Sequence, residues 1–129
     1  MKNAKGFTLV EIMIVVAIIA LLAAIAIPNL LRAKLSANDA LAKGTLRSLS
    51  TASEAFATAN SGNYPLTITA LTGATPPYTN SAYCGSTLSG YTYACTFAAG
   101  SYSYVATPGT VGTSGTTTYT ISTGGVLTP

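Results

Sequence analysis

The sequence contains no histidine and no tryptophan, and its six basic and three acidic residues all lie at or before Glu54. Residues 55–129 contain no Asp, Glu, Lys or Arg. General acid–base catalysis depends on ionisable side chains, and this part of the chain offers only tyrosine and two cysteines. We therefore expect that the protein is not an enzyme.

The scarcity of ionisable side chains also limits which metals, cofactors and nucleic acids the protein could bind. Two cysteines without histidine are too few for a structural zinc site, which takes four ligands. Hard cations need clustered carboxylates, and the sequence has no such cluster. Nucleic-acid affinity comes mainly from many Lys and Arg side chains on phosphates. The pI of about 9.0 reflects only six basic residues, so we expect no metal, no cofactor and no direct nucleic-acid site.

One long apolar run dominates the N-terminal quarter. From Phe7 to Ile27, only Thr8 and Glu11 are polar. As a helix this run is roughly 31 Å long, which matches the hydrocarbon core of a bilayer. It is too long for the apolar region of a secretory signal peptide, and the helical pattern continues beyond it. An ordinary single-span anchor, holding a binding module that stays monomeric, remains an alternative.

The presence of a charged residue, Glu11, in this apolar run needs an explanation. A carboxylate at the centre of a membrane helix costs about 2.5–3.5 kcal/mol or more. One interpretation is that the side chain reaches the lipid headgroups. The other is that a positive charge from elsewhere compensates it.

The N-terminal residues carry a strong resemblance. A short leader, Met1–Gly6, contains two lysines, ends in glycine and is followed by FTLVEIMIVVAIIALLAAIAIP. This pattern resembles the N-terminus of type IV pilins and pseudopilins. The resemblance implies that a membrane peptidase cuts between Gly6 and Phe7 and N-methylates Phe7. Many members carry a glycine in the middle of the run, where this chain has Ala20.

The resemblance also implies roles for two residues within the run. Glu11 matches the family's carboxylate at the fifth mature position, and Pro28 matches its proline at the twenty-second. In a filament, the carboxylate of one subunit would lie near the terminal amine of a neighbour. Removing one partner of a buried ion pair typically costs roughly 3–5 kcal/mol. We therefore expect Glu11 to act in subunit assembly.

Beyond Pro28, which should kink or open the helix, the pattern becomes amphipathic and continues to about Asn60. Asn60–Asn63, followed by Pro65, predicts its end. The charged residues of this half fall mainly off the apolar stripe. The stripe consists of Leu31, Leu35, Asn38, Ala42, Leu46, Leu49, Ser53 and Phe56.

The distal part is rich in threonine and tyrosine and alternates with the period of a strand. In GYTYACTFA, Tyr91, Tyr93, Cys95 and Phe97 face one way. SYSYVATP and TTTYTIST continue the pattern, and Gly124-Gly125 predicts a tight hairpin. We expect an α+β fold with three or four antiparallel strands packed on the amphipathic half-helix. The predicted parts are a leader (1–6), a transmembrane and filament-core helix (7–29), its amphipathic half (30–60) and a β domain (61–129).

Cys84 and Cys95 are the only cysteines. If the distal domain is exported, it enters an oxidising compartment, where such a pair favours a disulfide. A redox-active pair is disfavoured, because there is no C-x-x-C motif and no nearby cation to lower a thiol pKa.

The predicted function is that of a structural subunit of a type IV pilus-like filament. Its expected partners are copies of itself, the prepilin peptidase and methyltransferase, the inner-membrane assembly machinery and the membrane before assembly. The precursor would cross the inner membrane once with a cytoplasmic N-terminus, and the filament would be extracellular. A minor pilin, or a periplasmic type II secretion pseudopilin, is the alternative. Major pseudopilins generally have a calcium site near the C-terminus, and no carboxylate follows Glu54 here.

Overall fold

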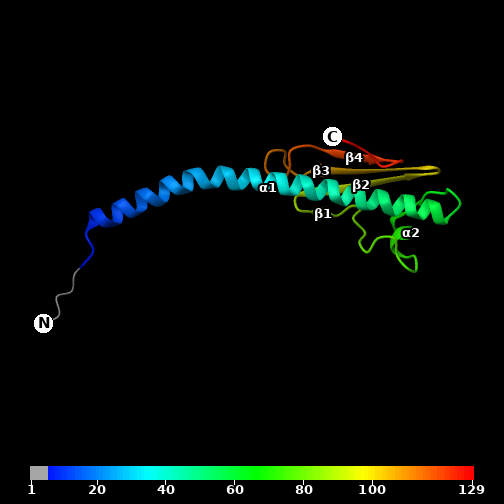
Figure 1. Ribbon diagram of the computed structural model, residues 1–129, viewed down its shortest axis with the longest axis horizontal. Helices are drawn as coiled ribbons and strands as arrows, with labels where there is room; N and C mark the ends of the chain where they lie inside the picture. The colour runs from blue at the N-terminus through cyan, green and yellow to red at the C-terminus, as the bar shows by residue number, and fades with distance from the viewer. Residues whose placement is uncertain (1–5) are drawn as a thin grey trace. The chain divides into compact units, whose positions relative to one another are not determined.

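A computed structural model describes residues 6–129, and residues 1–5 lie outside the described part. The chain divides into two compact units, one ending at Ala33 and one comprising Lys34–Pro129. The elements, shown in Figure 1, are α1 (Leu9–Ala59), α2 (Ile68–Thr72), β1 (Thr87–Leu88), β2 (Tyr91–Ala98), β3 (Ser101–Pro108), β4 (Tyr119–Ser122) and β5 (Val126–Thr128).

Helix α1 is continuous across Pro28. The proline therefore does not end the helix, and a kink at this position stays a prediction. The predicted C-terminal end is confirmed. Ser61 and Gly62 adopt positive φ values of 58° and 87°, and the Gly62 N–H donates to the carbonyl of Ala57 at 2.8 Å. This left-handed turn satisfies a carbonyl at the helix end.

The five strands form one antiparallel sheet in the order β1-β2-β3-β4-β5, so each strand pairs with its neighbour in sequence. The predicted α+β fold is confirmed, but the predicted count of three or four strands is too low. The additional strand, β1, has only two residues, too few for alternation to be visible in the sequence. The predicted hairpin at Gly124-Gly125 joins β4 to β5, with both glycines at positive φ.

The core of Lys34–Pro129 lies between the sheet and α1. The predicted alternation of β2 is confirmed, with Tyr91 and Tyr93 fully buried and the intervening positions exposed. The helix contributes Ala42, Leu46 and Leu49, each at most 1% exposed. The other members are on β3 and β4, namely Tyr102, Tyr104, Ala106, Tyr119 and Ile121. The predicted stripe thus meets the sheet at these positions, whereas Leu31 is exposed.

In the stretch of sequence that follows α1 and precedes β1, the chain forms α2 and a loop, neither of which the sequence analysis predicted. The buried side chain of Leu71 anchors α2. The loop returns to it, because the N–H of Tyr78 donates to the Leu71 carbonyl at 2.9 Å. The ring of Tyr78 packs edge-on against Phe56 of α1, with ring centroids 5.5 Å apart. These contacts hold the loop beside the helix (Figure 1).

Candidate functional site

The N-terminus of α1 is capped by three reciprocal hydrogen bonds between Thr8 and Glu11. The main-chain N–H and the hydroxyl of Thr8 donate to one carboxylate oxygen of Glu11, at 2.7 and 2.8 Å. The N–H of Glu11 donates to the Thr8 hydroxyl oxygen at 3.2 Å. This arrangement is a capping box, which satisfies N–H groups left unpaired in the first helical turn. Glu11 therefore has a partner within its own chain.

The sequence analysis missed this role for Thr8. The signal was present, because Thr8-Leu9-Val10-Glu11 is a T-x-x-E sequence immediately before an apolar run, which is the pattern of a capping box.

The apolar side chains of the first unit are exposed. Phe7, the predicted first mature residue, is 86% exposed, and Leu22 and Leu30 are 62% and 72% exposed. Among the described residues, α1 is the one helix that is long and apolar enough to cross a membrane, by length and composition, and none of its apolar window is buried. Exposed apolar surface on this scale marks a membrane or protein interaction site.

The second unit contains a buried carboxylate that the sequence analysis placed off the core-facing stripe. Asp39 is 9% exposed and accepts hydrogen bonds from the Tyr91 hydroxyl at 2.7 Å and the Thr116 N–H at 3.0 Å. The Thr116 hydroxyl donates to its other oxygen. Burial opposes ionisation, but these donors and the nearby Lys43 outweigh it and lower the pKa of Asp39. Burial and the adjacent carboxylate raise the pKa of Tyr91.

Glu54 forms a second carboxylate–tyrosine cluster. It accepts hydrogen bonds from the hydroxyls of Tyr102 at 2.8 Å and Tyr64 at 2.9 Å, and from the Gly124 N–H at 2.9 Å. Burial opposes ionisation here too, and the three donors lower the pKa of Glu54. Burial raises the pKa of Tyr102 to about 12, with a contribution from Glu54.

The two clusters fix α1 to the sheet and its loops. Asp39 and Glu54 are 15 positions apart, about 22 Å along the helix, and both bond to residues distant in the sequence. Hydroxyl pairs between Ser50 and Tyr102, and between Ser53 and Tyr104, lie between them. The consequence of this arrangement is mechanical, because its directional bonds orient the helix on the sheet.

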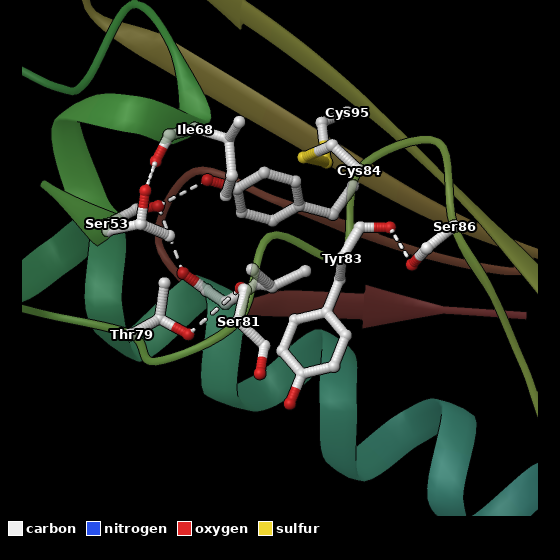
Figure 2. The surroundings of a disulfide bond; sticks show 11 residues. Ser53, Ile68, Thr79, Ser81, Tyr83, Cys84, Ser86 and Cys95 are labelled. Atoms are coloured by element: carbon white, nitrogen blue, oxygen red, sulfur yellow. Dashed lines mark hydrogen bonds between the residues drawn. A yellow bond between two sulfur atoms is a disulfide. The ribbon is translucent and has the colours of Figure 1, made fainter.

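The predicted disulfide between Cys84 and Cys95 is present, with Cα atoms 5.4 Å apart. It joins the loop preceding β1 to strand β2. Figure 2 shows the Tyr83 ring turned away from the sulfur atoms, and this ring lies 6.1 Å from that of Tyr93. The Ser86 hydroxyl donates to the Tyr83 carbonyl at 2.6 Å. The disulfide and this bond fix the end of the loop to the sheet.

Within residues 6–129, no three His, Cys, Asp or Glu side chains come together as metal ligands. Asp39 and Glu54 use their oxygens as acceptors for tyrosine, threonine and glycine donors. These carboxylates are therefore structural groups of the second unit.

Comparison with known proteins identifies relatives of part of the chain. Residues 1–27 match the prokaryotic N-terminal methylation motif. The Type IV wide pilus major component PilA4 of Thermus thermophilus is 69% identical over 39 residues, 30% of this chain and 30% of that protein. The Type IV major pilin protein PilA of Myxococcus xanthus is 52% identical over 52 residues, 40% of this chain and 24% of that protein. No solved structure matches significantly.

The matches thus span less than a third of the length of either relative. The methylation motif, the two pilin relatives and the helix packed on an antiparallel sheet agree with one another. The N-terminal part of the chain is thus similar to that of type IV pilins.

Proposed function

We propose that this protein is a structural subunit of a type IV pilus-like filament, assembled through its N-terminal helix after removal of residues 1–6. The observation that carries the proposal is the exposed apolar surface of α1 from Leu9 to Leu30. Water is an unfavourable environment for such a surface. Lipid covers it in the precursor, and the same helices of other copies cover it in the filament.

The methylation motif over residues 1–27 supports processing of the N-terminus. A prepilin peptidase cuts between Gly6 and Phe7, and the new amine of Phe7 is N-methylated and stays positively charged. Residues 1–5 lie outside the described part of the chain. Gly6 and Phe7 are exposed and precede the helix, which supports access by the enzyme.

Glu11 directs assembly in this proposal. Its carboxylate compensates the terminal amine of a neighbouring subunit, so that neither charge is buried alone. The capping box supports this role, because Thr8 holds the carboxylate beside the first helical turn, close in sequence to the terminal residue. A subunit added in the wrong register would leave both charges without their partners, at a cost of roughly 3–5 kcal/mol.

The two pilin relatives are named as major components of their pili, which supports a bulk subunit over a minor one. The precursor spans the inner membrane once with its N-terminus in the cytoplasm, and the filament is extracellular. The assembly machinery of the inner membrane extracts each subunit. The globular unit, Lys34–Pro129, coats the filament.

Mass spectrometry of material sheared from cells of the native host tests the proposal. We expect an N-terminal peptide that begins at N-methylated Phe7. Glu11→Gln should leave cleavage intact and remove the protein from the sheared fraction. Arg32→Gln, which changes a charged residue on the exposed surface of the same helix, is the control variant.

Three other outcomes would overturn the proposal. An uncut Met1 terminus in cells with active prepilin peptidase would indicate a monomeric single-span anchor. Processed protein confined to the envelope would indicate a secretion pseudopilin or a minor pilin. A Glu11→Gln variant that still forms filaments would remove the role proposed for the carboxylate.

A further inference from the structure

An open groove of about 530 Å³ lies within the second unit, between α1 and the loop that follows α2. Its volume falls in the range of small-ligand sites, about 300–1,000 Å³. The pilus function proposed above does not use this groove. The residues that give it its chemical character are Gly44, Arg47 and Ser48 on the helix and Tyr78, Asn80 and Tyr83 on the loop.

Arg47 is the one charged side chain among the residues lining the groove. The intramolecular hydrogen bonds at Arg47, Tyr78 and Tyr83 use main-chain atoms. The guanidinium and the two phenols therefore stay available to a ligand in the described part of the chain. Ser48 and Asn80 add a hydroxyl and an amide. The lining thus combines one cation, several hydrogen-bond donors and two aromatic rings, with no carboxylate.

Gly44 lines the groove without a side chain. A glycine in a helix interior costs about 1 kcal/mol relative to alanine. Nothing in the packing requires it, because an added Cβ would meet no atom within 4 Å. The structural effect of Gly44 is that the helix backbone borders the open space of the groove.

The loop wall is held in place without a ligand. The Cys84–Cys95 disulfide fixes one end of this wall. Tyr83 immediately precedes Cys84 in the sequence, as Figure 2 shows. At the other end, the Tyr78 ring packs on Phe56. An ordered wall reduces the entropy lost when a ligand binds.

We propose that this groove binds an acidic oligosaccharide, a chain of sugar rings that carry carboxylates. A guanidinium pairs with a carboxylate through two parallel hydrogen bonds. Tyrosine rings offer flat apolar faces with a polar edge, which suit the C–H faces and hydroxyls of sugars. The groove is open to solvent, so a ligand longer than the groove can extend beyond it. A nucleic acid is disfavoured, because its binding relies on several cations on phosphates and the groove has one.

The test uses the full-length chain in detergent micelles, with a short oligogalacturonate as the probe and a neutral maltooligosaccharide of equal length as the control. Titration calorimetry should detect binding of the acidic probe alone. Arg47→Gln should weaken it by about tenfold or more, as expected for a charge-assisted hydrogen bond, while Arg32→Gln should leave it unchanged. Gly44→Leu, which places a side chain in the open space at this lining position, should abolish it without loss of helical circular dichroism.

The proposal is overturned by equal affinity for the acidic and neutral probes, by absence of binding, or by equal effects of the two arginine variants. Tighter Arg47-dependent binding of an oligonucleotide would replace the saccharide with nucleic acid. The assay contains no assembled filament, so its failure is distinct from a failure of the proposed pilus function.

Discussion

The hydroxyl of Tyr91 in β2 donates a 2.7 Å hydrogen bond to the carboxylate of Asp39 in α1, across 52 positions of the sequence. One of the two acidic side chains of the second unit is thus bound to the centre of its core. Since Asp39 has further donors in Thr116, helix, sheet and distal loop meet at one group.

Tyr91→Phe should therefore destabilise the fold. The change removes one donor from an ionised, buried acceptor, and we expect a loss of about 1.5–3 kcal/mol in the free energy of unfolding. Tyr93→Phe is the matched control on the same face of the same strand. The Tyr93 hydroxyl is buried with no hydrogen-bond partner in the described part of the chain, so this variant should be as stable as the parent or more stable. Urea titration of both variants measures the difference, and equal losses would contradict the prediction.

Acid should weaken the attachment of the helix to the sheet. The folded-state pKa values of Asp39 and Glu54 lie below their ordinary values of 3.8 and 4.5. Their contribution to stability is therefore present above those ordinary values and is lost as the pH falls through the lowered ones. The thermal midpoint should decline below about pH 4.5. The double variant Asp39→Asn/Glu54→Gln should show a flatter decline, and an unchanged slope would argue against these groups.

High pH should destabilise the fold through ionisation of buried tyrosines. The pKa of Tyr102 is raised to about 12, so the neutral phenol is favoured in the folded state. The contribution of Tyr102 to stability is present below its ordinary pKa of 10.0 and is lost as the pH rises through the folded-state pKa. Tyrosinate absorbance should therefore appear together with loss of near-ultraviolet circular dichroism. Tyrosinate formation in Tyr102 without unfolding would contradict this expectation.

Gly115 makes a close approach that tolerates no side chain. A Cβ at this buried position would overlap the ring of Tyr91, and Gly115→Ala should cost about 1–3 kcal/mol by overpacking. Gly109→Ala is the control, because its Cβ would be in ordinary contact at 3.5 Å from the nearest atom. Thermal unfolding of both variants checks the prediction, which fails if the two alanines are equally tolerated.

Thr8 should matter through its hydroxyl. Thr8→Ala removes one donor to Glu11 and the acceptor for the Glu11 N–H, and loss of a cap costs about 1 kcal/mol. We expect fewer sheared filaments from Thr8→Ala, normal cleavage at Phe7 and recovery in Thr8→Ser. Immunoblots of the sheared and envelope fractions measure this. A Thr8→Ser variant as defective as Thr8→Ala would point to the methyl group instead.

The sequence predicted the parts of the fold in which a simple period decides the structure. The alternation from Tyr91 to Phe97 and the stripe through Ala42, Leu46 and Leu49 placed the core correctly, because burial follows the period of the element. The disulfide was also predicted, from the two cysteines and the expected compartment.

The positions that the sequence analysis missed are those set by long-range contacts. Asp39 looked like a solvated helix residue, and its burial depends on donors 52 and 77 positions away. The absence of acidic residues after Glu54 was a signal, because a tyrosine-rich sheet then depends on the helix for carboxylate acceptors. Helix α2 has five residues and β1 has two, too few for either to show a period.

The donors that hold Asp39 and Glu54 are uncharged: phenols, a threonine hydroxyl and main-chain amides. Dissolved electrolyte screens attraction between opposite charges at a surface, but it has less effect on a short hydrogen bond from a neutral donor. The attachment of the sheet to the helix should therefore depend only weakly on ionic strength.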